Sequence, residues 1–220
     1  PVIVSDTGYS SILGYNDMGW EVKWQSATSG KGFDSIHVSD AYSKYRVWWG
    51  HNDIVHFMGL PKDIINPSEV SEFAYATSAV HETPWFNAGQ SEIDKLALEL
   101  KVETQDLSTK ETVQVQYAVD YDETYLNFTD SSGDDMSTIT STTLGTTSGI
   151  TEFSFRDGSP NYNPIGKKFR SIKFKLTLAR STTTSEANYL KNSPDVVSMT
   201  LIWRKKLDAK WGHQVGVSLN

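Results

Sequence analysis

The chain has 220 residues, no cysteine and a formal net charge of −7. Its length allows one large all-β domain or two smaller ones, and a chain of this size buries about 70% of its unfolded surface. Without cysteine it has neither disulfides nor thiolate metal sites, which fits assembly in a reducing cytosol, and no run approaches the ~18 apolar residues of a membrane span.

Residues 1–90 form an irregular, β-rich N-terminal segment in this interpretation. Short strands are predicted at Trp20–Trp24, Lys44–Trp49 and Ile54–Met58, and turn-forming residues between the last two predict a hairpin. Strand, hairpin and strand resemble a propeller blade, although a propeller needs typically four to eight blades. Because the chain begins at Pro1 and not at Met, we expect either processing or a longer protein of which this is a part.

Residues 91–220 hold the regular strands. Four runs alternate apolar and polar residues, so every second side chain shares one face of a strand. The apolar positions are Leu96, Leu98, Leu100 and Val102; Val113, Val115, Tyr117, Val119 and Tyr121; Ile172, Phe174, Leu176 and Leu178; and Val197, Met199, Leu201 and Trp203. Half-buried strands of this kind build antiparallel sandwiches. The predicted fold is an all-β, jelly-roll-like antiparallel β-sandwich with an N-terminal β-rich extension.

The connections between these runs carry their own signals. The polar tract 129–147 predicts an exposed loop or flexible arm. In the strand predicted from Phe169 to Leu178 the alternation slips near Arg170, which indicates a bulge. A helical turn is expected at 185–191, and a last strand at 211–219 is expected to close the sheet.

The sequence holds no catalytic, cofactor-binding or metal-binding signature, so we predict no enzyme activity and no cofactor. Asp130, Asp134 and Asp135 lie in one predicted loop, and their oxygens could bind calcium, but the spacing does not match an EF-hand. A solvated turn is the preferred interpretation, and calcium stays open. His51 and His56 flank the predicted hairpin turn and could face each other, yet two imidazoles without a third ligand make a poor zinc site.

Two aromatic pairs, Trp48–Trp49 and Trp85–Phe86, could stack on sugar rings or pack between domains. Neighbouring strand residues point to opposite faces, so only one of Trp48 and Trp49 can lie in a core.

Basic residues concentrate at 165–211, with 11 Lys and Arg against 3 acidic residues. Those that alternate with apolar strand residues are expected on a solvated outer face: Lys168, Arg170, Lys173 and Lys175. Nucleic acid is therefore not an expected partner.

Five segments of the C-terminal half resemble a known family. They are Lys95–Val102, Val115–Asp120, Leu144–Gly149, Phe169–Arg180 and Ser193–Trp203. Through them, residues 92–219 resemble a β-sandwich module of tailed-bacteriophage structural proteins, which propeller-like sequence often precedes. The resemblance implies a non-enzymatic, tail-associated virion protein, assembled in the bacterial cytoplasm, that mediates assembly or contact with the host surface. It implies partners among other virion proteins and copies of itself, with a host-surface glycan or receptor as a further partner.

Two other functions stay open from the sequence. One is a carbohydrate-binding β-sandwich module of a glycan-binding or glycan-active protein, for which Trp49 and Trp85 are the candidate contacts. The other is a bacterial surface adhesion domain. Binding of a defined glycan that is lost when either tryptophan is replaced by alanine would favour the carbohydrate-binding module.

Overall fold

The computed structural model describes residues 2–4, 8–16, 19–60, 74–156, 165–185 and 189–206. The chain divides into two compact units, Pro1–Ala74 and Tyr75–Asn220, which we call unit 1 and unit 2 and describe separately. Both consist of antiparallel strands, so the predicted all-β class is confirmed. The boundary lies at residue 74, ahead of the predicted residue 90, because the next strand pairs within unit 2.

Unit 1 consists of two three-stranded sheets, in the orders β1-β2-β3 and β4-β5-β6. Its elements are β1 (Val2–Val4), β2 (Tyr9–Asn16), β3 (Gly19–Ser29), β4 (Phe33–Ser39), the 3-10 turn η1 (Ala41–Ser43), β5 (Arg46–His51) and β6 (Ile54–Gly59). This pair of meanders differs from the predicted propeller blade, which is a single four-stranded sheet. The predicted hairpin is present as β5 and β6, and Asn52 and Asp53 in its turn have φ of 54° and 61°, as a two-residue type I′ turn requires.

The core of unit 1 draws on both of its sheets and centres on Ile12, Val47 and Trp49. Trp49 is 3% exposed. Trp48 lies on the other face of β5, where it is half-buried and its ring packs on Phe57 with centroids 4.9 Å apart. Only one of the two tryptophans enters the core, as predicted from strand alternation.

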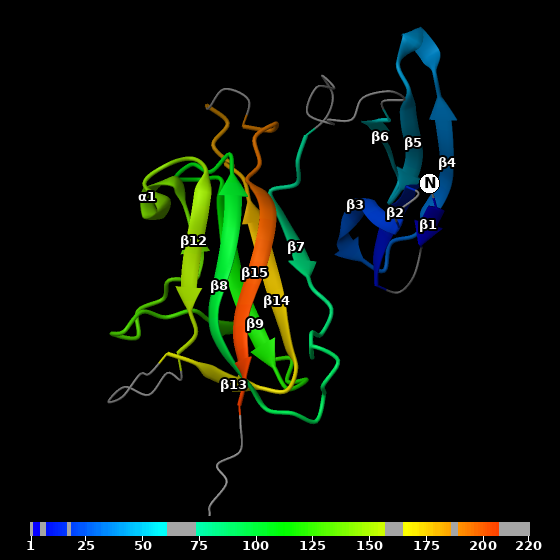
Figure 1. Ribbon diagram of the computed structural model, residues 1–220. Helices are drawn as coiled ribbons and strands as arrows, with labels where there is room; N and C mark the ends of the chain where they lie inside the picture. The colour runs from blue at the N-terminus through cyan, green and yellow to red at the C-terminus, as the bar shows by residue number, and fades with distance from the viewer. Residues whose placement is uncertain are drawn as a thin grey trace, which may run out of the picture. The chain divides into compact units, whose positions relative to one another are not determined.

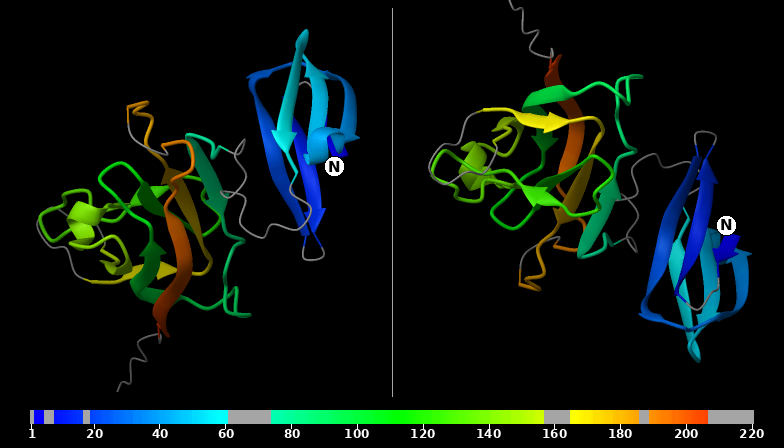
Figure 2. Two further views of the ribbon diagram at one scale, coloured as in Figure 1. Left: turned by 90° about the horizontal axis from the view of Figure 1, so that it is seen from above. Right: turned by 90° about the horizontal axis from the view of Figure 1, so that it is seen from below.

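Unit 2 is a sandwich of two antiparallel sheets. The β9 sheet has β10 (Leu126–Asn127) and β11 (Thr138–Ile139) beside β9 (Thr112–Val119), then β14 (Ile172–Ala179) and β7 (Ser78–Glu82). The β8 sheet has β12 (Gly149–Ser154) and β13 (Lys167–Phe169) along one side of β8 (Lys95–Gln105) and β15 (Asp195–Lys205) along the other. Figure 1 shows the two layers from the side, and Figure 2 shows them from both ends.

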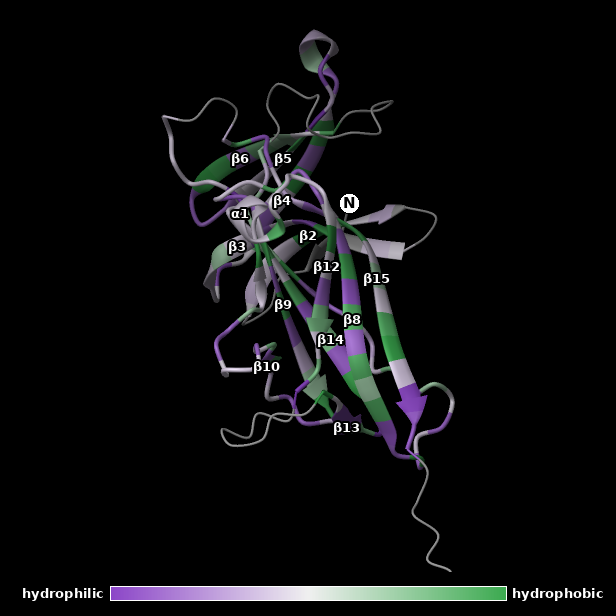
Figure 3. Cartoon of the chain, turned by 60° about the vertical axis from the view of Figure 1, so that its left-hand side comes forward, coloured by the Kyte–Doolittle hydropathy of each residue, from purple (hydrophilic) through white to green (hydrophobic). Residues whose placement is uncertain are grey.

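The core of unit 2 lies between these sheets and is built mainly from aromatic and branched side chains. Its phenylalanines are Phe128, Phe153, Phe155, Phe169 and Phe174. The rings of Phe128 and Phe155 meet edge to face at 5.0 Å, a geometry that aromatic quadrupoles favour. Figure 3 shows the alternation of hydropathy along the strands that produces this core. Each buried side chain of this size contributes about 1.5–3 kcal/mol.

Strand β8 keeps the predicted alternation only in part. Leu100 and Val102 are buried as expected, but Leu96 and Leu98 are half-exposed and Ala97 is fully buried in their place. The pairing of β8 with β15 shifts by one residue between Ala97 and Glu99, just before the buried Leu100. A β-bulge of this kind inserts one residue and turns the following side chains to the opposite face. The predicted inward positions Leu96 and Leu98 are therefore wrong.

The other three runs follow the prediction more closely. In β9 and β14 the predicted inward side chains are buried at Val113, Val115, Tyr117, Ile172, Phe174 and Leu176. Tyr121 lies beyond the end of β9 and is 58% exposed. In β15 a register shift at Val197 leaves that side chain 51% exposed, so the predicted face holds only from Met199 onward.

The slip predicted as a bulge near Arg170 is a change of sheet. Phe169 ends β13 in the β8 sheet, and Ile172 begins β14 in the β9 sheet. One predicted strand is therefore two strands in opposite layers. Because Phe169 and Ile172 are both fully buried, the chain crosses from layer to layer through the core edge within two residues.

The polar tract 129–147 is less free than predicted. Ser137 and Ile139 are buried, and β11 pairs with β9. A short helix, α1 (Ser141–Leu144), begins after Thr140, whose hydroxyl accepts a hydrogen bond from the Thr143 amide at 3.1 Å. These contacts fix the second half of the tract, so it is not a flexible arm. Of the other predicted elements, the turn at 185–191 lies partly outside the described residues, and the strand at 211–219 lies wholly outside them.

Candidate functional site

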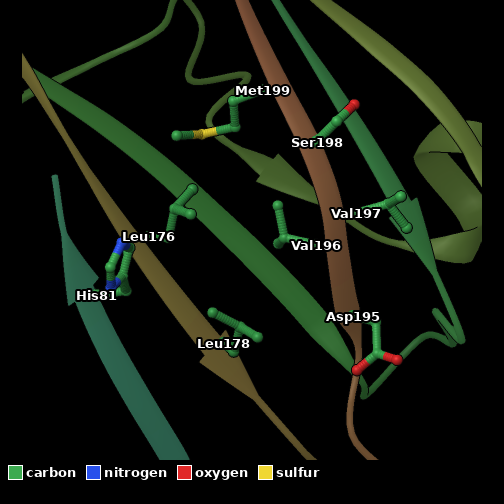
Figure 4. A pocket seen from close by; sticks show the side chains of 8 residues that line it. All are labelled: His81, Leu176, Leu178, Asp195, Val196, Val197, Ser198 and Met199. Carbon is green, nitrogen blue, oxygen red and sulfur yellow. The ribbon is translucent and has the colours of Figure 1, made fainter. Parts of the chain in front are cut away.

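Unit 2 has an open side on which each sheet ends in an edge strand. β7 borders the β9 sheet and β15 borders the β8 sheet, and neither has an outer partner among the residues that the structure describes. The groove between them has a volume of about 750 Å³ and is lined by His81, Leu176, Leu178, Asp195, Val196, Val197, Ser198 and Met199. Figure 4 shows the side chains of Leu176, Leu178, Val196 and Met199 in the space between β14 and β15.

The edge of β15 lacks most of the features by which proteins protect an edge strand. It is 11 residues long, about twice the usual strand length. Residues 196–203 contain neither proline nor a charged side chain, and Val197 and Ile202 are 51% and 36% exposed. Apart from the bulge at Val197, none of the strands that the structure describes pairs with its outer backbone groups, so within the described ranges they can pair with another strand.

The two ends of β15 carry opposite charge. Asp195 stands at the start, where burial and the nearby carboxylate of Asp106 raise its pKa. Arg204, Lys205 and Lys206 follow one another at the other end, and all three are exposed. The strand is therefore acidic at one end, apolar along its middle and basic at the other end.

A second, polar pocket of about 400 Å³ lies where the chain changes sheets. It is lined by Ser91, Glu92, Asp94, Asp120, Tyr121, Lys168 and Arg170. The Asp94 carboxylate accepts hydrogen bonds from Lys168 Nζ at 2.6 Å and Arg170 Nε at 3.0 Å, and these two partners lower its pKa. Residues far apart in the sequence thus converge on this end of the sandwich.

The wall of this pocket is held by a buried lysine and an aspartate. Lys95 is 0% exposed, and its ammonium group donates to the carbonyl oxygens of Gln90 at 2.6 Å, Ile93 at 3.0 Å and Arg170 at 2.9 Å. Asp120 Oδ1 accepts from the Arg170 amide at 2.5 Å. The change of sheet at Arg170 is thereby fixed from both sides.

The sequence predicted Lys173 on a solvated face, but the structure buries this residue, which is 6% exposed. Its ammonium group pairs with Glu123 and lies 5.0 Å from the ring centre of Trp85 and 5.2 Å from that of Tyr125. The hydrogen bond with Glu123 is the main reason that its pKa is raised. Lys168 and Arg170 are exposed and Lys175 is half-buried, so the prediction is wrong mainly at Lys173.

Two of the three carboxylates in the predicted loop, those of Asp130 and Asp135, accept hydrogen bonds from nearby groups of the protein. Asp130 Oδ1 accepts from the amides of Ser132 at 2.7 Å and Asp134 at 3.0 Å, which lowers its pKa. Asp135 accepts from Asn127 Nδ2 at 2.6 Å and the Ser137 amide at 2.8 Å. Within the described ranges, no cluster of three or more His, Cys, Asp or Glu has metal-binding geometry. The hydrogen bonds of Asp130 and Asp135 support the solvated turn.

Because Asp130 and Asp135 already accept hydrogen bonds from the protein, we expect calcium to leave the melting temperature unchanged within about 1 °C. Binding that stabilised the protein by about 1 kcal/mol would raise the melting temperature by about 2–4 °C. Thermal unfolding with calcium and with a chelator measures this. The double substitution Asp134→Asn and Asp135→Asn is the control. A rise in melting temperature with calcium that is absent in this variant would show that the loop binds calcium.

The predicted histidine pair is present, with the ring centres of His51 and His56 5.9 Å apart. Both rings pack on Trp24, and His56 stacks on Trp49 at 5.5 Å. The pair belongs to the aromatic core of unit 1. Trp85 packs on Tyr121 at 5.0 Å, and Phe86 on Trp203 at 6.3 Å.

Comparison of the chain with protein-family models, curated proteins and solved structures finds no match. Across the described ranges, no helix has the length and apolar character needed to cross a membrane. We therefore infer function from the groove, the edge strand and the polar pocket themselves.

Proposed function

We propose that this chain is a non-enzymatic structural protein of a tailed bacteriophage virion, associated with the tail and acting in assembly or host contact. The best support is the edge of β15, which no described strand covers, beside an apolar groove, since such an edge is suited to binding another chain. The resemblance of residues 92–219 to phage structural modules supplies the setting.

The charge order along β15 favours a second copy of this chain as the partner. When two β15 strands lie antiparallel about a two-fold axis near Thr200, Asp195 of one copy meets Lys205 of the other, twice. The apolar middles then lie side by side. A parallel arrangement would instead bring like charges together, which is unfavourable.

Lysine on the β15 edge should prevent this association. We expect the double substitution Val197→Lys and Ile202→Lys to convert a self-associating protein to a monomer with an unchanged circular dichroism spectrum. Both side chains are exposed, so the charges cost little in the isolated unit, whereas in the pair the added lysines of the two copies would lie close together and repel each other. Light scattering coupled to size-exclusion chromatography measures the mass.

Ile150→Lys is the matched control, because Ile150 is 56% exposed on β12 at the opposite edge of the same sheet. This variant should associate like the wild type. Equal masses for the double variant and the wild type would exclude the β15 edge as the contact.

The virion setting has its own test. Gold-labelled antibody against this chain should mark the tails of particles of the phage that encodes it. Particles that carry no label after the protein is detected in the same lysate would contradict a structural role in the virion.

A further inference from the structure

We propose that the polar pocket at the change of sheet binds a neutral saccharide. Its residues are separate from the β15 edge, so the inference does not depend on the proposed self-association. It also differs from the sequence-based candidates, because Trp49 is buried in unit 1, and Trp85 packs on Tyr121 without lining the pocket itself.

Tyr121 gives the pocket an aromatic rim. Residues 119–122 form a tight turn closed by the Asp122 amide and the Val119 carbonyl at 3.0 Å, with φ of 57° at Asp120 and 63° at Tyr121. A bulky residue rarely adopts this left-handed conformation, and a turn of this kind normally uses Gly or Asn. The turn holds the Tyr121 ring against Trp85, and the residue as a whole is 58% exposed. An exposed, braced aromatic face of this kind suits the C–H face of a pyranose ring.

The pocket beside this rim offers unused donors and acceptors. The Arg170 guanidinium contacts Asp94 through Nε, and no described residue accepts a hydrogen bond from its two terminal nitrogens. None of the described residues hydrogen-bonds to the Ser91 hydroxyl or the Glu92 carboxylate, which also line the pocket. Neighbouring sugar hydroxyls each donate and accept, so a guanidinium and a carboxylate together match such a pair.

The backbone that carries Arg170 is rigid before any ligand binds. Lys95 Nζ holds the Arg170 carbonyl at 2.9 Å, and Asp120 holds the Arg170 amide at 2.5 Å. The Asp120 amide in turn donates to the Ser171 carbonyl at 2.8 Å. A site fixed in this way loses little conformational entropy on binding.

The charges of the pocket select a neutral ligand. Lys168 and Arg170 stand against Glu92, Asp94 and Asp120, and Asp94 already pairs with both cations. The sum of these five charges is −1, which disfavours an anion. Asp120 already accepts hydrogen bonds from two backbone amides, and the Glu92 carboxylate alone supplies too few oxygens to hold a metal cation. The volume of about 400 Å³ lies within the 300–1,000 Å³ range of small-molecule sites and suits one or two sugar rings.

The test uses the full chain, a panel of neutral tetrasaccharides of glucose, galactose, mannose or N-acetylglucosamine, and one anionic polysaccharide for comparison. Saturation-transfer NMR detects binding, and calorimetric titration measures affinity. At least one tetrasaccharide should bind, and Tyr121→Ala or Glu92→Ala should each weaken it by about tenfold or more. Glu92 is exposed and has no hydrogen bond with any described residue, so its loss leaves the fold intact.

Tyr42→Ala is the matched control, because Tyr42 is also a tyrosine with positive φ, 58°, and is 95% exposed in unit 1. It should bind like the wild type. Absence of binding across the panel would overturn the proposal. Binding confined to an anionic polysaccharide and lost in Lys168→Ala would overturn the neutral class. Equal loss in Tyr42→Ala would place the site elsewhere.

Tyr121→Gly separates a binding role from a structural one. Glycine relieves the left-handed strain, and this offsets the loss of the contact with Trp85. We expect a melting temperature within about 3 °C of the wild type together with loss of saccharide binding. A larger fall in melting temperature would show that Tyr121 serves the fold.

Discussion

Replacing Lys95 by methionine is expected to lower the free energy of unfolding of unit 2 by about 3 kcal/mol or more. Methionine fills a similar volume but donates no hydrogen bond. It would leave the carbonyl oxygens of Gln90, Ile93 and Arg170 without the donor that now serves all three. Urea unfolding followed by circular dichroism measures the loss.

Lys110→Met is the control, because Lys110 is an exposed lysine of the same unit and bonds to Thr183 at 3.0 Å on the surface. Its effect should stay within about 0.5 kcal/mol. Equal stability of the Lys95 variant and the wild type would show that the three carbonyls find other partners and that Lys95 does not fix the change of sheet.

The same lysine gives a pH dependence with a defined sign. Burial lowers the pKa of Lys95 in the folded protein. Between this lowered pKa and about 10.4 the unfolded chain binds the proton more tightly, so the contribution of Lys95 to the free energy of unfolding rises with pH. The difference in stability between wild type and Lys95→Met should therefore change across that range. A difference in unfolding free energy that stays the same across this pH range would contradict a buried Lys95 ammonium group with a lowered pKa.

Reversing one charge on β15 is expected to weaken self-association by about tenfold. Asp195→Lys places lysine against Lys205 of the second copy, and Lys205→Asp places aspartate against Asp195, each twice per pair because the contact is two-fold symmetric. Exposed ion pairs contribute about 0.2–1 kcal/mol each, so two reversed contacts account for this factor. Sedimentation velocity over a range of concentrations measures the dissociation constant.

The double variant Asp195→Lys and Lys205→Asp should regain most of the lost affinity, because it restores unlike charges in the same antiparallel alignment. Recovery is the decisive result, since damage to the fold would not be repaired by a second substitution. A double variant that associates more weakly than either single variant would contradict the antiparallel pairing of β15.

Strand positions were largely predictable, because the two-residue period follows directly from one buried face. The faces of β9 and β14 agree with that period from Val113 to Tyr117 and from Ile172 to Leu176. The bulge in β8 could not be foreseen, because it depends on the pairing with β15 about 100 residues later. A single slip there exchanged Leu98 for Ala97 as an inward residue.

The candidate sites were less accessible to sequence reasoning than the fold. The groove arises between two edge strands that are distant in the sequence, and no local pattern marks a strand as an edge. Lys95 stands at the start of an apolar run, where the sequence pattern predicts an exposed lysine at the end of a strand and gives no sign that its side chain is buried. Tyr121 continued an alternating run and was predicted inward, whereas the turn at Asp120 places it outward. Among the candidate binding residues, the placement of one of Trp48 and Trp49 in the core followed from alternation alone.

Amide hydrogen exchange of β15 at low and high protein concentration tests the proposed contact most directly. If copies of the chain join through this edge, amides within 195–205 should become protected as concentration rises, while those of β12 at the opposite edge stay unchanged. Exchange in β15 that is the same at every concentration, in a protein that nevertheless associates, would show that assembly uses another surface.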